Sequence, residues 1–225
     1  MKAALPLLSL IFLFASCKNT SGSTHDKELA IQQTQDPVEM PKVDGLKRAY
    51  FASGCFWCVE AVYESVKGVD HAVSGYSGGT EKNPTYRQVG SGSTGHAEAV
   101  EVFYDPSVVS FQTLVDVFFG SQDPTTKNRQ GPDRGTQYRS IAFYQNKEQK
   151  KIIENTIKRL NKSTYDGKIT TQVLPFQKFW KAEDYHQNYE RNHPNDAYIQ
   201  GVSIPRINRF KAKFPDLLKD NAGTH

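Results

Sequence analysis

The stretch RAYFASGCFWCVEAVYESV, residues 48–66, joins two different patterns across a single glycine. Residues 48–52 are short and rich in aromatic side chains, which is typical of a β-strand. After Gly54, apolar side chains recur at helical spacing, at Val59, Val62, Tyr63 and Val66. The stretch therefore predicts a strand, a turn at Gly54, and a helix that begins at the Cys-x-x-Cys pair of Cys55 and Cys58.

Strand and helix patterns alternate through the rest of the chain. Apolar and alternating runs predict strands at 69–76, 97–104, 137–145 and 170–174. Helical spacing predicts helices over 111–118, capped by Ser110, and over 147–160 and 182–191. The glycine-rich segment 74–95 and the polar segment 121–136 predict long loops. The alternation favours a single α/β or α+β domain in which helices pack over a sheet.

Composition excludes several classes of protein. Of 225 residues, 37% are hydrophobic, which is enough for one sizeable core or two small ones. The net charge of +4 and the mean hydropathy of −0.61 exclude an acidic disordered chain, a polybasic nucleic-acid tail and a polytopic membrane protein. Only three cysteines are present, an odd number that argues against a disulfide scaffold.

The first residues read MKAALPLLSLIFLFASC and have the organisation of a secretory signal. Lys2 is followed by an apolar stretch too short to span a bilayer and then by small residues before Cys17. The segment resembles the lipobox of bacterial lipoproteins, which implies cleavage before Cys17 and lipid attachment to it. An ordinary signal that leaves Cys17 free, or a short membrane anchor, are the alternatives. Lipidation implies a protein anchored in the bacterial cell envelope, at the periplasmic or outer-membrane face.

These features divide the chain into four parts. Residues 1–16 are the predicted lipoprotein signal peptide, and 17–45 are the lipid attachment site and a polar, flexible tether. Residues 46–215 form the predicted folded domain, and 216–225 a polar tail.

Cys55 and Cys58 carry the most reactive chemistry in the sequence. The first turn of a helix offers free N–H groups and a positive dipole end, which favour a thiolate and lower the pKa of a cysteine. Three sites fit the pair: a structural zinc site, a thioredoxin-like oxidoreductase, or a dedicated reductase with a nucleophilic and a resolving cysteine. Phe56 and Trp57 between them suit an apolar substrate group, although an aromatic pair in the core has the same pattern.

Glu98 is the best candidate for a general acid. On the predicted strand it shares a face with Val100 and Val102, so its carboxyl should be desolvated. Desolvation raises the pKa of a carboxyl and keeps it protonated near neutral pH. The alternative is an ordinary glutamate at the surface edge of the strand.

The segment GCFWCVE (54–60) resembles the active-site motif of the A-type peptide methionine sulfoxide reductases. Further segments agree with the family in the same order, at GYSGG (75–79), NPTYRQV (83–89), GHAEAVEVFYDP (95–106), DPTTKNRQGPDRGTQYRS (123–140) and FWKAEDYHQNY (179–189). The resemblance covers about residues 48–190. It implies a two-layer α/β sandwich with a mixed sheet covered by helices and a ferredoxin-like core.

The resemblance also implies roles for individual residues. Cys55 corresponds to the nucleophile that attacks the sulfoxide sulfur, and Glu98 to the donor that protonates its oxygen. Phe56 and Trp57 correspond to the aromatics that enclose the S-methyl group. Three further substrate-binding residues match polar groups of the family, namely Tyr86, Asp133 and Tyr138.

The implied reaction reduces S-epimer methionine sulfoxide, in oxidised proteins or free, to methionine. Cys55 becomes a sulfenic acid, Cys58 attacks it to form a disulfide, and a thioredoxin-like reductant, or dithiothreitol in vitro, restores the dithiol. Residues 191–225 contain no cysteine, so Cys58 is the only resolving thiol that counting allows. We expect no bound cofactor, metal or nucleic acid, and a monomer. A general thiol–disulfide oxidoreductase and a lipid-anchored peptide-binding module remain as alternatives.

Overall fold

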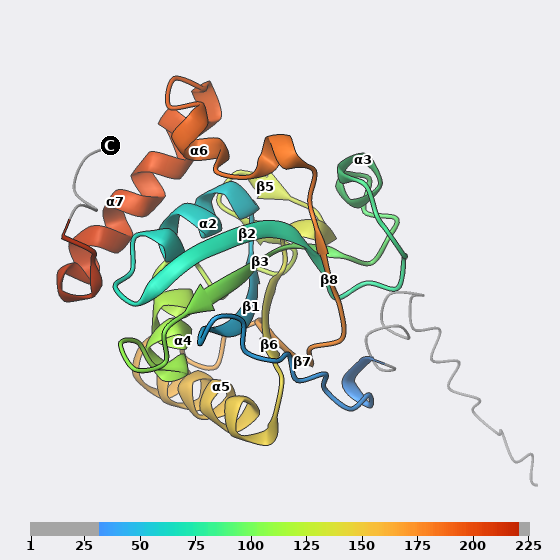
Figure 1. The fold of residues 1–225 in the computed structure, drawn as a ribbon, viewed down its shortest axis with the longest axis vertical. Coiled ribbons are helices and arrows are strands. Elements are labelled where there is room, and N and C mark those ends of the chain that lie inside the picture. Colours follow the sequence, from blue (N-terminus) through green and yellow to red (C-terminus); the bar gives the residue numbers. More distant parts are fainter. Residues whose placement is uncertain (1–31, 221–225) are drawn as a thin grey trace, which may run out of the picture.

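A six-stranded sheet forms the centre of the protein in a computed structural model that describes residues 32–220 (Figure 1). Its order is β7-β6-β1-β3-β2-β8, with the strands at Lys47–Ser53 (β1), Val69–Ser77 (β2), Ala97–Tyr104 (β3), Ser140–Tyr144 (β6), Gln172–Pro175 (β7) and Phe179–Lys181 (β8). Neighbours are antiparallel except β6 and β7, so the sheet is mixed. The order β6-β1-β3-β2 is that of a ferredoxin-like core, which confirms the predicted fold class.

The helices lie at Phe56–Glu64 (α2), Tyr86–Gly90 (α3), Phe111–Gly120 (α4), Lys147–Leu160 (α5), Tyr189–Asn192 (α6) and Ile204–Lys213 (α7). Side-chain caps explain where two of them begin. Ser110 accepts a hydrogen bond from the Thr113 N–H at the start of α4, and Asn146 accepts one from the Gln149 N–H at the start of α5. Both helices start where the sequence predicted, and α7 packs against α2 (Figure 1).

The two faces of the sheet bury different layers. Alternation along β1 sends Ala49 and Phe51 into the core shared with the helices, and Tyr50 and Ala52 to the opposite face. On that opposite face, the Tyr50 ring stacks on Phe176 with centroids 3.7 Å apart. The helix-covered face is therefore the larger core, and the predicted arrangement of helices over a sheet is present.

The ends of the domain differ from the predicted boundaries. Val38 N–H donates to the Phe176 carbonyl at 2.8 Å and Met40 N–H to Gln145 Oε1 at 2.9 Å, so part of the predicted tether lies against the domain. Beyond residue 215, Lys219 N–H donates to the Ser65 carbonyl at 2.9 Å. Parts of the segments that composition predicted as a tether and a tail therefore lie against the domain, held by backbone hydrogen bonds.

Several elements in the predicted loops and in the C-terminal part were missed. Segment 74–95 contains α3, and segment 121–136 contains a short hairpin of Arg129–Gln130 (β4) and Asp133–Arg134 (β5). The predicted helix over 182–191 is wrong: a 3-10 turn at Asp184–His186 is separated from α6 by Asn188, whose φ of 53° is left-handed. The strand predicted at 137–145 begins only at Ser140, after a 3-10 turn.

No helix within residues 32–220 is long and apolar enough to cross a membrane. Cys17 and the predicted signal peptide lie outside the described residues.

Candidate active site

A sharp turn at Gly54 carries the chain from β1 into α2 and places Cys55 at the start of the helix. Gly54 has a φ of +84°, and a Cβ there would lie 2.6 Å from the Gln130 Cβ, so only glycine fits this turn. Cys55 is the residue immediately before the first turn of α2, and Cys58 is within that turn. Both thiols are free and buried, with 6% and 1% exposure.

The two thiols interact, and their pKa values differ from the expectation for Cys55. Burial raises the pKa of the Cys55 thiol, which outweighs the effect expected from the helix N-terminus. The pKa of Cys58 is lowered to about 7, first by a hydrogen bond from Cys55 and then by the positive charge of Arg206. The pair therefore loses its first proton near neutral pH, with the charge on Cys58 before substrate binds.

Glu98 lies on β3 with its carboxyl directed at the start of α2. The side chain is 1% exposed, and Phe56 N–H donates to its Oε2 at 3.0 Å. Burial raises the pKa of Glu98 to about 8, so the carboxyl is largely protonated at neutral pH. The buried position and the raised pKa that the sequence predicted are both present. The Glu98 carboxyl, which can donate a proton, is therefore bound to the backbone of the residue that follows Cys55.

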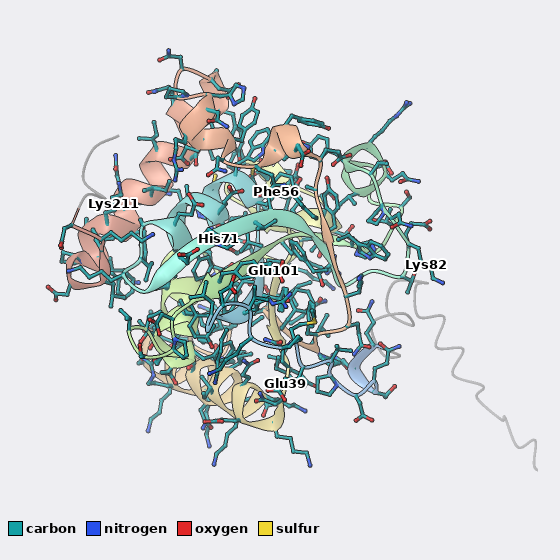
Figure 2. All side chains as sticks on the ribbon, in the orientation of Figure 1. Glu39, Phe56, His71, Lys82, Glu101 and Lys211 are labelled. Carbon is teal, nitrogen blue, oxygen red and sulfur yellow. The ribbon has the colours of Figure 1, made fainter. Side chains whose placement is uncertain are left out.

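Several aromatic rings, called here the aromatic wall, pack around Phe56. Phe56 lies at the start of α2 (Figure 2). Phe56 lies 6.2 Å from the Tyr86 ring and 5.0 Å from the His186 ring. Trp57 stacks on Tyr189 with centroids 3.8 Å apart, and its Nε1–H donates to His186 Nδ1 at 3.2 Å. This hydrogen bond orients the indole.

Tyr86 and Tyr138 bring phenol groups to the same place. Burial raises the pKa of Tyr86 to about 12 and also raises that of Tyr138, and the neighbouring Glu98 and Cys55 add to both shifts. The phenols therefore remain protonated and can donate hydrogen bonds. Two residues far apart from α2 in sequence are thus gathered beside Cys55 and Glu98.

Asp133 is joined to the cysteines through Tyr198, a residue that the sequence reasoning did not single out. Tyr198 OH donates to Asp133 Oδ2 at 2.7 Å and lies 4.0 Å from Cys58 Sγ. Burial raises the pKa of Asp133. Tyr198 lies in NDAYIQ (195–200), where no periodicity or charge pattern distinguishes it from the other tyrosines.

The fold and this constellation define a cysteine-dependent reductase with a protonated buried carboxyl and an aromatic wall. Residues 47–218 match the family model described as "Peptide methionine sulfoxide reductase". The chain is 48% identical to peptide methionine sulfoxide reductase MsrA 1 of Rhodopirellula baltica, over 81% of this chain and 94% of that one. It is also 48% identical to MsrA of Sulfolobus acidocaldarius, over 75% of this chain and 95% of that one.

Solved structures agree with this result. The reduced form of Mxr1 from Saccharomyces cerevisiae matches with a TM-score of 0.63 and 33% identity, over 70% of this chain and 91% of that one. Methionine sulfoxide reductase A of Corynebacterium diphtheriae matches with a TM-score of 0.62 and 34% identity, over 72% and 83% respectively. The chain belongs to the peptide methionine sulfoxide reductase family and is an oxidoreductase of the A type.

Proposed function

We propose that the protein reduces the S epimer of methionine sulfoxide, both in oxidised proteins and as the free amino acid, and so repairs oxidative damage. The observation that carries this proposal is the buried Glu98 carboxyl, with its pKa of about 8, beside the Cys55 thiol and the Phe56 ring. Reduction of a sulfoxide needs a nucleophile for sulfur and a proton for oxygen, and these two groups supply them.

In the proposed reaction, Cys55 gives up its proton and attacks as a thiolate while the S–O oxygen takes the Glu98 proton, and the proton from Cys55 restores the Glu98 carboxyl. Tyr86 and Tyr138 donate hydrogen bonds to that oxygen, and Asp133, held by Tyr198, completes the polar side. Phe56 and Trp57 contact the S-methyl group, since sulfur and methyl groups pack favourably on aromatic rings. Methionine leaves and Cys55 remains as a sulfenic acid.

Cys58 then resolves the sulfenic acid. It lies in the first turn of α2, within hydrogen-bond reach of Cys55, so a disulfide needs only local movement. Each turnover consumes two electrons, which matches the two thiols. A thioredoxin-like dithiol protein returns them by thiol–disulfide exchange, and dithiothreitol replaces it in vitro.

The epimer preference tests the proposed reaction. A racemic methionine sulfoxide peptide incubated with the protein and dithiothreitol should lose its S epimer completely and keep its R epimer. The fixed positions of Glu98 and the aromatic wall around Cys55 are compatible with one arrangement of oxygen and methyl group on sulfur. Chiral chromatography of the products measures both epimers over time. Consumption of neither epimer, or of both at equal rates, would reject the proposal.

We also propose that the chain is a monomeric lipoprotein of the cell envelope. The sequence around Cys17 supports cleavage after a signal peptide of residues 1–16, and the segment that follows supports a polar tether to the domain. Several acyl chains on one cysteine give stable anchoring, whereas a single chain is marginal.

Replacement of the lipidated residue tests this anchoring. Cys17→Ser is expected to abolish incorporation of radiolabelled palmitate and to move the protein from the membrane pellet to the soluble fraction, since the acyl chains are lost. Reductase activity should be unchanged, because Cys17 is far in sequence from Cys55. Cys58→Ser is the matched control and should keep its label. A wild type without label, or a Cys17→Ser protein still in the pellet, contradicts the proposal.

A further inference from the structure

Arg206, on α7, is a buried cation directly behind the turn that begins α2. It is 7% exposed, and its Nη1–H and Nη2–H donate to the Ser53 carbonyl and hydroxyl at 2.9 and 3.1 Å. Its Nε–H donates to the Ser121 carbonyl at the end of α4, at 2.8 Å. Three hydrogen bonds thus fix the guanidinium, two to Ser53 and one to Ser121. Ser53 is the residue two positions before Cys55 in the chain.

The partners of this guanidinium are neutral. Among residues 32–220, Arg206 forms no salt bridge, and its three hydrogen bonds are to carbonyl and hydroxyl oxygens. A buried charge without an ionic partner is costly, which favours a negative charge nearby. The positive charge of Arg206 favours the ionised forms of Cys58 and of Asp133, and Cys58 is the one of these two that reacts.

The face of α7 that carries Arg206 points toward Cys58. Ser203, three residues earlier, is fully buried and lies close enough to Cys58 to lower the pKa of that thiol, and residues three apart share a helix face. Helices α2 and α7 also pack on each other. The geometry therefore places the hydroxyl of Ser203 and the charge of Arg206 together on the side of Cys58 that faces α7.

We infer that Arg206 is a positioning residue that holds Cys58 as a thiolate and thereby sets the rate at which the Cys55–Cys58 disulfide forms. The inference deepens the proposed function and rests on it. In this step the Cys58 sulfur attacks the Cys55 sulfenic sulfur, an S–S bond forms and the S–O bond breaks. The leaving hydroxide combines with the proton given up by Cys58, so the products are a disulfide and water.

The other ionisable groups around Cys58 act in different directions. They are Cys55, Glu98, Glu190 and Tyr198, and Asp133 is connected to Cys58 through Tyr198. Glu190 accepts a hydrogen bond from the Ser203 hydroxyl, burial raises its pKa, and its charge opposes ionisation of Cys58. Arg206, in contrast to these groups, carries a positive charge, and this charge contributes to the lowered pKa of Cys58.

A single turnover separates the two chemical steps. The full chain with Cys17→Ser, so that only Cys55 and Cys58 carry thiols, is reduced, freed of reductant and mixed with one equivalent of methionine sulfoxide peptide. Methionine formation reports the first step, and the decay of dimedone-reactive Cys55 reports the second. The two neutral variants Arg206→Gln and Arg206→Met are compared with Arg206→Lys, which keeps the charge, and with Arg209→Gln, an exposed arginine on the same helix.

We expect the neutral variants to form methionine within about twofold of the wild-type rate. Their sulfenic acid should persist about fivefold longer at pH 7, because a one-unit rise in the pKa of the attacking thiol from about 7 lowers its thiolate fraction from about one half to about one tenth. This difference should shrink below about twofold at pH 9, where the thiol ionises without help. Arg206→Lys should restore most of the rate, Arg209→Gln should match wild type, and Cys58→Ser should form one equivalent of methionine and no disulfide.

Three results would overturn the inference alone: disulfide formation as fast as wild type in a neutral variant, slowing by the same factor at pH 7 and pH 9, or an Arg206→Lys protein as slow as Arg206→Gln. The second of these is what a purely structural role of the arginine would give. Absence of methionine from the wild type would instead overturn the proposed function, and with it the inference.

Discussion

Cys55→Ser is expected to reduce methionine formation below detection, by more than about 10⁴-fold, as deletion of a catalytic nucleophile does. The thiolate is the reactive form of cysteine, whereas a serine hydroxyl does not ionise near neutral pH. Cys58 cannot take over the first step, because it is 1% exposed and faces Tyr198 and Ser203. The measurement is chromatographic quantification of methionine from a sulfoxide peptide with dithiothreitol as reductant.

Cys58→Ser provides the control for this variant, because the two cysteines are three residues apart in one helical turn. It should form one equivalent of methionine in the absence of reductant, whereas Cys55→Ser should form none. Equal thermal unfolding midpoints would show that neither loss arises from misfolding. Turnover by Cys55→Ser would remove Cys55 from the role of nucleophile. It would then favour a peptide-binding module or a site in which Cys58 reacts first.

Local patterns account for what the sequence predicted correctly. The strand at 97–104 and the helix at 147–160 have the predicted bounds, because alternation and helical spacing in them report one buried face. The same alternation identified Glu98 as a buried carboxyl on β3. The resemblance to the reductase family, and not local pattern, supplied Tyr86, Asp133 and Tyr138 as further residues of the site.

Features that depend on distant contacts were not predictable from local pattern. Strand β8 is three residues long and exists because it pairs with Gly75 and Tyr76 of β2. The break at Asn188 follows from a hydrogen bond, in which its N–H donates to the buried Glu60 carboxyl at 2.6 Å. Periodicity reports neither a partner 128 residues away nor the hydrogen bond to it.

The pKa values of the two thiols likewise depend partly on local sequence and partly on distant contacts. A helix N-terminus is visible in the sequence and lowers the pKa of a cysteine, but burial is a property of the assembled fold and acts in the opposite direction. Burial dominates at Cys55, whereas Cys58 gains a hydrogen bond from Cys55 and the charge of Arg206. Three residues that further modify the pKa values of the two thiols, Tyr198, Ser203 and Arg206, all come from the C-terminal part of the chain, where sequence patterns predicted little.

Glu98→Gln is expected to lower kcat/KM by about 10²- to 10⁴-fold, the range for loss of a general acid. Glutamine keeps the size of the side chain and can still accept the Phe56 N–H bond, so the start of α2 should stay in place. It has no proton to transfer to the sulfoxide oxygen. Steady-state kinetics on a sulfoxide peptide should therefore show the loss in kcat, with KM changed little.

The pH profile distinguishes this role from a structural one. The pKa of Glu98 is about 8, so in the wild type the donor is present below pH 8 and is lost as pH rises through that value. Wild-type kcat/KM should fall by about tenfold per unit once the pH exceeds both the pKa of Glu98 and the raised pKa of Cys55, because the donor is then lost with no further gain of thiolate. In Glu98→Gln that fall should be absent, and the residual rate should rise with pH as Cys55 ionises.

Glu101→Gln is the matched control on the same strand, because Glu101 accepts hydrogen bonds from Tyr50 and Arg48, away from the cysteines. It should retain both the activity and the descending limb of the wild type. If the pH profile of Glu98→Gln kept that descending limb, a group other than Glu98 would be the proton donor to the sulfoxide oxygen. Near-wild-type kcat in Glu98→Gln would mean that the hydrogen bonds of Tyr86 and Tyr138 stabilise the oxygen without proton transfer from a carboxyl, and the buried acid would then serve only to hold the Phe56 backbone.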